Sequence, residues 1–171
     1  ELVGMTAEIG DDSSEITVKN YLGKQGWVIT PNKGNNARYI NVDIDDSIAH
    51  SVTDGQSYAV AVEYYDEGRS SLTIEYDSMK YQPIIRQETG EMNANTPLNA
   101  SVNAGEREYI IFNDTKVWRN YQWFLPNPRF ANELDGYDFR VGIYSKSMGY
   151  SRGGEVTISA IRLYRLDTVS R

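Results

Sequence analysis

Residues 57–76 read SYAVAVEYYDEGRSSLTIEY, and this stretch decides the fold. In its first half, Tyr58, Val60, Val62 and Tyr64 alternate with Ala59, Ala61, Glu63 and Tyr65. In its second half, Leu72, Ile74 and Tyr76 alternate with Thr73 and Glu75. Because successive side chains of a strand point to opposite faces, this period of two predicts two β-strands, at Ser57–Tyr65 and Leu72–Tyr76.

The same period of two recurs along most of the chain. Further strands are predicted at Glu15–Lys19, Gly26–Thr30, Ala37–Ile44, Pro83–Arg86, Glu108–Phe112, Val117–Leu125, Asp138–Tyr144 and Glu155–Leu166. Turn-forming residues separate them, among them Asp54-Gly55, Asp66-Glu67-Gly68 and Asp135-Gly136. Tyr65-Asp66-Glu67-Gly68 predicts a hairpin connection, since Gly68 can take the positive φ of a tight turn. About nine or ten short strands with a turn every ten or so residues indicate an all-β sandwich or barrel.

Composition narrows the class of protein. The chain has 171 residues, of which 24 are acidic and 17 basic, so its formal net charge is −7. An acidic surface repels phosphate, and we expect no nucleic-acid partner and no insertion into a membrane, since no apolar run approaches the roughly 20 residues of a span. The chain lacks cysteine and opens at Glu1 without a signal-peptide pattern. We expect residues 1–171 to form one domain, monomeric within a larger chain.

Two segments resemble a known class of domain. Residues 36–78 read NARYINVDIDDSIAHSVTDGQSYAVAVEYYDEGRSSLTIEYDS, and residues 118–141 read WRNYQWFLPNPRFANELDGYDFRV. Together they resemble non-catalytic, carbohydrate-binding-module-like domains appended to secreted bacterial polysaccharide-degrading enzymes. The resemblance implies a two-sheet antiparallel β-sandwich of the jelly-roll type, a secreted or cell-surface location, and a polysaccharide or oligosaccharide as partner.

Flat aromatic rings beside hydrogen-bonding groups are what a sugar site requires. On the strand Val117–Leu125, Trp118, Asn120 and Gln122 share one face and are the first ligand candidates. On the other face, the resemblance implies that Tyr121, Trp123 and Leu125 point inward. Trp27 starts another strand, where it serves either the core or a ligand platform.

The loop of residues 144–152 is the second candidate site. It combines Tyr144, Lys146, Tyr150 and Arg152 with serines. Arginine can fork onto a carboxylate and lysine adds charge, which would suit an acidic glycan. An ordinary solvated hairpin loop is the alternative.

Calcium enters only through the resemblance, since such modules often hold one ion between an early strand and the last. Asp11, Asp12 and Glu15 supply carboxylates near the N-terminus. Calcium takes six to eight oxygen ligands, several of them carboxylates. The last strand, however, reads Ser159-Ala160-Ile161-Arg162 where an acidic ligand is expected. A structural Ca²⁺ is therefore an open alternative, and no other cofactor is expected.

Three functions follow in order. The first is non-catalytic glycan binding by an accessory module, and the second is a structural or cell-surface adhesion domain. A sandwich-type polysaccharide lyase is third, because residues 138–144, DFRVGIY, loosely resemble an active strand of such lyases. The Gln-x-His that accompanies that strand is absent, and the one histidine, His50, lies beside a turn. We therefore expect no catalysis.

Overall fold

The computed structural model describes residues 4–9, 17–30, 37–49, 56–76, 110–125, 128–132, 134, 136–144 and 155–166. All regular secondary structure in these ranges is β-strand. The same ranges contain no apolar helix of membrane-spanning length.

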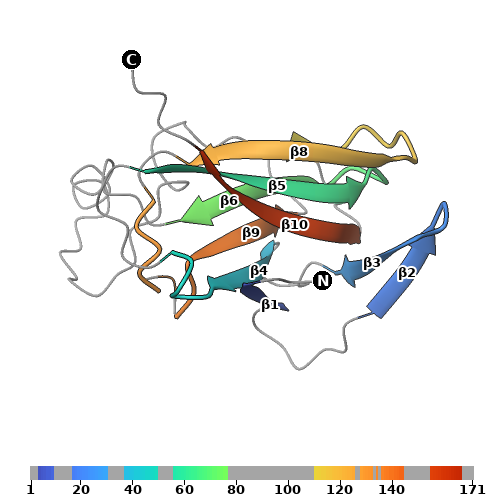
Figure 1. Ribbon diagram of the computed structural model, residues 1–171. Helices are drawn as coiled ribbons and strands as arrows, with labels where there is room; N and C mark the ends of the chain where they lie inside the picture. Colours follow the sequence, from blue (N-terminus) through green and yellow to red (C-terminus); the bar gives the residue numbers. More distant parts are fainter. Residues whose placement is uncertain are drawn as a thin grey trace, which may run out of the picture.

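Ten strands form two antiparallel sheets that pack face to face (Figure 1). In spatial order, the first sheet contains β1 (Met5–Ile9), β4 (Ala37–Ile44), β9 (Phe139–Tyr144), β6 (Ser71–Tyr76) and β7 (Ile110–Ile111). The second sheet contains β2 (Thr17–Tyr21), β3 (Lys24–Ile29), β10 (Val156–Leu166), β5 (Ser57–Tyr65) and β8 (Trp118–Leu125).

The path of the chain between these sheets is that of a jelly roll. From β3 to β10, consecutive strands lie in alternate sheets, except that β6 and β7 share one. Strands adjacent in sequence therefore wrap around the core, and most pairing joins strands that are distant in sequence, such as β5 with β10 and β4 with β9. The two-sheet antiparallel sandwich expected from the sequence is confirmed.

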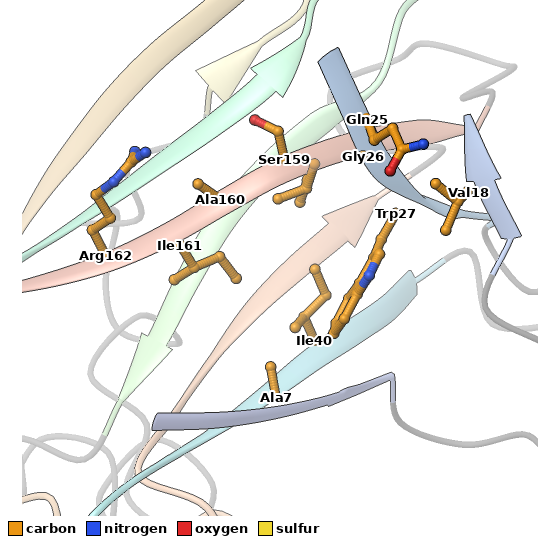
Figure 2. Close-up of a pocket in the computed structure, with 11 residues that line it drawn as sticks. Ala7, Val18, Gln25, Gly26, Trp27, Ile40, Ser159, Ala160, Ile161 and Arg162 are labelled. Carbon is orange, nitrogen blue, oxygen red and sulfur yellow. The ribbon is translucent and has the colours of Figure 1, made fainter. Parts of the chain in front are cut away.

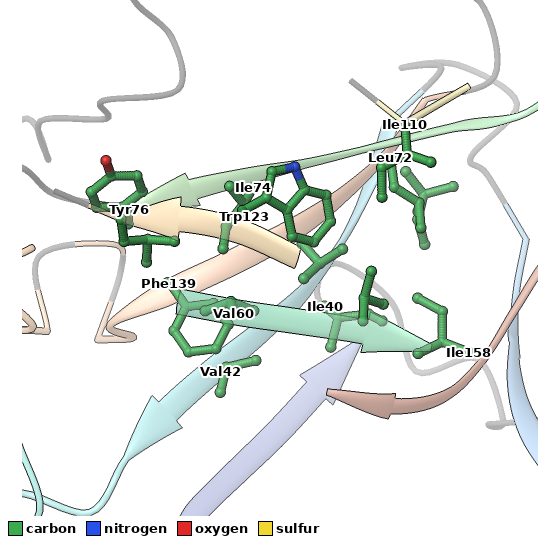
Figure 3. Close-up of a cluster of buried hydrophobic side chains, with 14 of the residues drawn as sticks. Ile40, Val42, Val60, Leu72, Ile74, Tyr76, Ile110, Trp123, Phe139 and Ile158 are labelled. Atoms are coloured by element: carbon green, nitrogen blue, oxygen red, sulfur yellow. The ribbon is translucent and has the colours of Figure 1, made fainter. Parts of the chain in front are cut away.

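The core lies between the sheets and follows the alternation of the strands (Figure 3). Val60 of β5 faces Trp123 of β8 across the pairing, and both are buried, Trp123 with 1% of its surface exposed. Leu125 is also buried, and Tyr121 packs against the core. The inward orientation that the resemblance implied for these β8 residues is therefore confirmed.

A β-bulge divides β10 into two parts. Up to Ile158, β10 pairs with β3 on one side and β5 on the other; Ser159 is then passed over, and Ala160 pairs with Glu63. Pairing with β3 spans only Val156–Ile158, so β3 and β10 separate at the bulge. An extra residue of this kind bends the strand and interrupts the ladder.

The segment after β5 differs from the hairpin turn that Asp66-Glu67-Gly68 suggests. Gly68 has the positive φ, 77°, that the turn sequence predicts. However, β5 and β6 belong to different sheets, so the segment carries the chain across the sandwich. The hairpin prediction is therefore wrong, because the segment joins strands of different sheets. Asp66 is buried and holds a neighbouring loop, as described below.

Candidate functional site

A cleft of about 420 Å³ opens where β3 and β10 separate (Figure 2). Its apolar lining comes from both sheets and consists of Ala7, Val18, Trp27, Ile40, Ile158 and Ile161. The small and polar residues along it are Gln25, Gly26, Ser159, Ala160 and Arg162. The cleft thus has an apolar floor at the open side of the sandwich and polar groups supplied by β3 and β10.

Two local features give the cleft its shape. The bulge at Ser159 ends the pairing of β10 with β3, so that the two strands diverge beyond it. On the paired side, Gly26 lets the strands approach closely, because a Cβ there would lie 2.6 Å from Thr157 Cγ2 and 2.9 Å from the Ile158 carbonyl oxygen. The strands are therefore held close at one end and apart at the other.

Trp27 is the aromatic residue of the cleft. Its indole reaches from β3 toward Ile40 on β4, with Ala7 of β1 beyond it (Figure 2). The ring is only partly buried, and it packs against the hydrophobic core as well as lining the cleft. The two roles that the sequence left open for Trp27, core and platform, are thus both compatible with its position.

Beside the cleft, the Glu63 carboxylate is fully engaged. Glu63 accepts hydrogen bonds from Lys24 Nζ and from Ser159 Oγ, the latter at 2.7 Å. Burial acts to raise the pKa of Glu63, but the hydrogen bonds from Lys24 and Ser159 outweigh it, and the pKa lies below its ordinary value. Glu63 therefore stays ionised, with its charge balanced by Lys24.

Trp118 lies elsewhere, in what we term the aromatic cluster: Tyr21, Tyr65 and Trp118 on the outer face of the second sheet. Tyr21 stacks on Tyr65 with ring centroids 4.0 Å apart, and Tyr65 meets Trp118 edge-on at 5.4 Å. Trp118 Nε1 donates a hydrogen bond to the Tyr21 carbonyl oxygen at 2.8 Å. Lys24 Nζ lies 5.5 Å from the centre of the Trp118 ring. The rings mainly contact one another and the β2–β3 hairpin.

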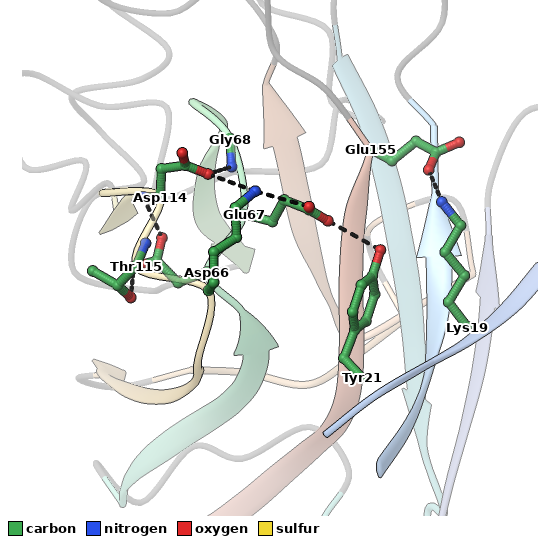
Figure 4. Close-up of polar contacts among 9 residues, drawn as sticks. Lys19, Tyr21, Asp66, Glu67, Gly68, Asp114, Thr115 and Glu155 are labelled. Atoms are coloured by element: carbon green, nitrogen blue, oxygen red, sulfur yellow. Dashed lines mark hydrogen bonds and ion pairs between the residues drawn. The ribbon is translucent and has the colours of Figure 1, made fainter. Parts of the chain in front are cut away.

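A polar network continues from this cluster (Figure 4). Tyr21 donates to Glu67 at 3.0 Å, and Lys116 donates to the same carboxylate at 2.9 Å. Lys19 and Glu155 form a further ion pair between β2 and the start of β10. These contacts attach the β2–β3 hairpin, one wall of the cleft, to the rest of the sandwich.

Asp66 anchors the loop between β7 and β8. Its carboxylate accepts backbone N–H groups of Asn113 at 2.8 Å, Asp114 at 3.2 Å and Thr115 at 3.3 Å, and the Thr115 hydroxyl at 2.5 Å. Only 1% of Asp66 is exposed. Burial acts to raise the pKa of Asp66, but these hydrogen bonds outweigh it and lower the pKa. Asp66 therefore has a structural role in positioning Trp118, which follows this loop.

The structure brings together only some of the residues predicted to bind ligand. Trp118, Asn120 and Gln122 share the outer face of β8, as expected, and pair with Tyr65, Glu63 and Ala61 of β5. None of the three lines the cleft, whereas Trp27 does. Tyr144 ends β9, but its side chain and the residues Lys146, Tyr150 and Arg152 lie outside the described part of the chain.

The proposed calcium ligands also fall outside that part. Asp11, Asp12 and Glu15 precede β2 in a segment that the structure does not describe. Among the described residues, no group of three acidic or histidine side chains is arranged to hold a metal ion.

Sequence reasoning missed the three polar residues of the cleft lining, Gln25, Ser159 and Arg162. All three precede or follow apolar strand residues and look like ordinary solvent-facing positions. Only the separation of β3 from β10 makes them neighbours of one ligand-sized space.

No protein-family model matches the chain, and no curated protein matches it. Among solved structures, the enzymatically active domain of tailspike protein 4 from bacteriophage CBA120 is similar at a TM-score of 0.48 and 10% identity. The match covers 95% of this chain but only 19% of the tailspike, so this chain spans less than a fifth of that protein.

Two carbohydrate-binding modules are similar over nearly their whole length. CBM28, specific for non-crystalline cellulose, has a TM-score of 0.46 and 13% identity, with 94% of this chain and 87% of the module covered. The family 11 module from Clostridium thermocellum, in complex with a β-1,3-1,4-mixed-linked tetrasaccharide, has a TM-score of 0.38 and 10% identity, covering 96% and 90%. Both are of the class that the sequence resembles. Likenesses at this level assign no role to any residue of this chain.

Proposed function

We propose that this domain binds a polysaccharide or oligosaccharide in the cleft between β3 and β10, with Trp27 as the platform for one sugar ring. The observation that carries the proposal is a cleft of about 420 Å³ with a partly exposed indole on its apolar side and polar groups at its edge. Ligand sites usually occupy about 300–1,000 Å³ and combine apolar walls with a few polar groups. A pyranose has the matching chemistry, with C–H groups on its faces and hydroxyls around its rim.

Binding is proposed without catalysis. Glycosidases place two carboxylates on either side of the scissile bond. Among the described residues that line the cleft, the one ionisable side chain is Arg162. The adjacent Glu63 is held by Lys24 and Ser159. In the proposed setting, an accessory module of a secreted or cell-surface protein, weak binding keeps a neighbouring domain close to its glycan.

Affinity electrophoresis tests this proposal against two sets of soluble polysaccharides. The neutral set is hydroxyethylcellulose, xyloglucan, mixed-linkage β-glucan and galactomannan; the acidic set is polygalacturonate, alginate, carrageenan and xanthan. We expect at least one gel to retard the domain. Trp27→Ala should weaken that binding about tenfold or more, as loss of a central aromatic contact does.

The control is Phe124→Ala, which removes an exposed aromatic residue of β8 outside the cleft and should leave retardation unchanged. Because Trp27 also packs against the core, Gln25→Ala provides a second cleft variant at an exposed position. Thermal unfolding of each variant shows whether it is folded. Lack of retardation by every glycan would contradict the proposed function. Retardation that survives both cleft variants would contradict the proposed site.

Exposed rings on the second sheet favour one alternative, a docking or adhesion domain. Phe124 is 58% exposed and Tyr164 is 45% exposed, and both pair across β5 with Ala59 on the outer face. Such a surface suits contact with a neighbouring protein domain. A docking domain should be retarded by none of the glycans. If a glycan does retard the domain and Phe124→Ala/Tyr164→Ala, not Trp27→Ala, abolishes the retardation, the exposed face binds the glycan and the cleft does not.

A further inference from the structure

The cleft carries a positive charge on an acidic protein. The chain has a formal net charge of −7, yet the single ionisable residue among the described cleft-lining residues is Arg162. The bulge in β10 determines its position, because Ile161 pairs with Val62 on the core side and Arg162 pairs with Ala61 on the outer side. Arg162 extends from the opposite side of β10 to Ile161 (Figure 2). Arg162 therefore lies at the outer edge of the cleft, on the side of β10 opposite to the apolar floor.

The neighbouring charges leave Arg162 available for a ligand. Glu63 interacts with Arg162 through space, and its own contacts are with Lys24 and Ser159. No ion pair joins Arg162 to another residue in the described part of the chain. Among these three described residues, Lys24 and Arg162 carry two positive charges against the one negative charge of Glu63.

We propose that the cleft selects a glycan with an anionic substituent, a carboxylate or a sulfate ester, which Arg162 binds while the sugar ring lies against Trp27. This inference rests on the proposed function and names its ligand class. A planar guanidinium can donate two parallel hydrogen bonds to such a group, and hydrogen bonds between ionised partners are stronger than neutral ones. A neutral sugar would leave this capacity unused.

The negative charge of the whole protein does not oppose such selection at short range. At physiological salt, charges more than about 8 Å apart are largely screened, so the local excess around Arg162 outweighs distant carboxylates. We therefore expect the preference for an anionic glycan to persist at physiological ionic strength.

The test uses each glycan from the two sets that retards the domain. If that glycan carries uronate or pyruvate, its carboxyl groups are reduced to alcohols; if it is carrageenan, its sulfate esters are removed. Isothermal titration then compares the original and the neutralised polymer. We expect the neutralised polymer to bind about tenfold more weakly, and the treatment that has this effect identifies the anionic group.

Three variants, at two positions of β10, assign the preference to a residue. Arg162→Gln should remove the difference between original and neutralised polymer, and Arg162→Lys should keep part of it, since lysine retains charge but not the fork. Arg165→Gln, an exposed position of β10 outside the cleft lining, should keep it fully.

Failure of this inference is distinct from failure of the proposed function. If the domain binds only the neutral set through Trp27, or binds original and neutralised polymers equally, the function stands and the anionic preference is refuted. An anionic preference that Arg162→Gln leaves intact refutes the assignment to Arg162. If neither set binds, the proposed function fails and this inference fails with it.

Discussion

The cleft and the aromatic cluster both contain tryptophan beside polar groups, but their contacts differ. In the aromatic cluster, the Trp118 N–H is bonded to Tyr21 and the ring is bordered by Tyr65 and Lys24. In the cleft, Trp27 is partly exposed next to a space large enough for a sugar ring. Both tryptophans are partly exposed, so the comparison teaches that an aromatic residue on a sheet is a ligand candidate when a ligand-sized space lies beside its ring, and not through exposure alone. Substitutions at three positions test this division into a structural and a binding region.

Asp66→Ala should have the largest effect, and only on stability. The substitution removes an acceptor for three backbone N–H groups and one hydroxyl at a buried position. Leaving such groups without partners should lower the free energy of unfolding by about 3 kcal/mol. Denaturant unfolding measures the loss, and glycan affinity at a temperature where the variant is folded should match wild type. A variant as stable as wild type would show that Asp66 does not hold this loop.

The same carboxylate should add to acid sensitivity. Because the folded-state pKa of Asp66 is lowered, its stabilisation is complete above about pH 4, the ordinary range of the group, and is lost as the pH falls through the lowered value. The stability difference between wild type and Asp66→Asn should therefore shrink below about pH 4. The contribution of Asp138 to stability should have the opposite pH dependence, because burial raises the pKa of its carboxyl group. Its contribution is present at low pH and is lost as the pH rises through its raised pKa. If the stability difference between wild type and Asp66→Asn does not change with pH, the ionised Asp66 carboxylate does not contribute to acid sensitivity.

Gly26→Ala should have an intermediate effect and should act on both properties. The added Cβ would contact the backbone of Ile158, so β3 must move away from β10. Such overpacking costs about 1–3 kcal/mol. Because the movement displaces the wall that carries Trp27, glycan affinity should fall as well. Isothermal titration measures the glycan affinity and thermal unfolding measures the stability. Normal affinity in a destabilised variant would show that glycan binding does not depend on the close approach of β3 and β10.

Trp118→Phe should have the smallest effect. Phenylalanine keeps an aromatic edge against Tyr65 but loses the hydrogen bond to the Tyr21 carbonyl, which is worth about 1 kcal/mol. Glycan affinity should not change, because Trp118 does not line the cleft. A large loss of affinity with little loss of stability would instead transfer the binding role to the outer face of β8, where the sequence first suggested it.

The architecture was largely predictable, because strand periodicity is a local property of the sequence. Ser57–Tyr65 and Ala37–Ile44 are strands with the predicted bounds, and Trp123 is buried as expected. The short edge strand β1 was missed although Met5, Ala7 and Ile9 alternate with polar residues. The turn of the β2–β3 hairpin was missed too, because Leu22 has a positive φ of 55° that leucine rarely adopts.

The cleft was not predictable by the same means, because it depends on where two strands that are distant in sequence separate. One local signal was nevertheless present. The inward-facing residues of β10 are Val156 and Ile158 and then Ile161 and Leu163, so the spacing changes from two to three and back. That irregularity marks the bulge. The approach of Gly26 to β10 and the engagement of Glu63 by Lys24 follow only from the pairing of the strands.

Because of the bulge at Ser159, the alternation of inward-facing and outward-facing residues along β10 shifts by one residue at this point. Before Ser159 the even-numbered residues of β10 face the core, and after it the odd-numbered residues do. The loss of one residue at this point would bring both parts of the strand into a single alternation. Deleting Ser159 would join Ile158 directly to Ala160, so that Val156, Ile158, Ile161 and Leu163 face inward in one regular alternation and the pairing with β5 continues without interruption. A single missing residue here would therefore keep the inner and outer faces of β10 but remove the bulge at which β10 and β3 separate, and with it the opening of the cleft.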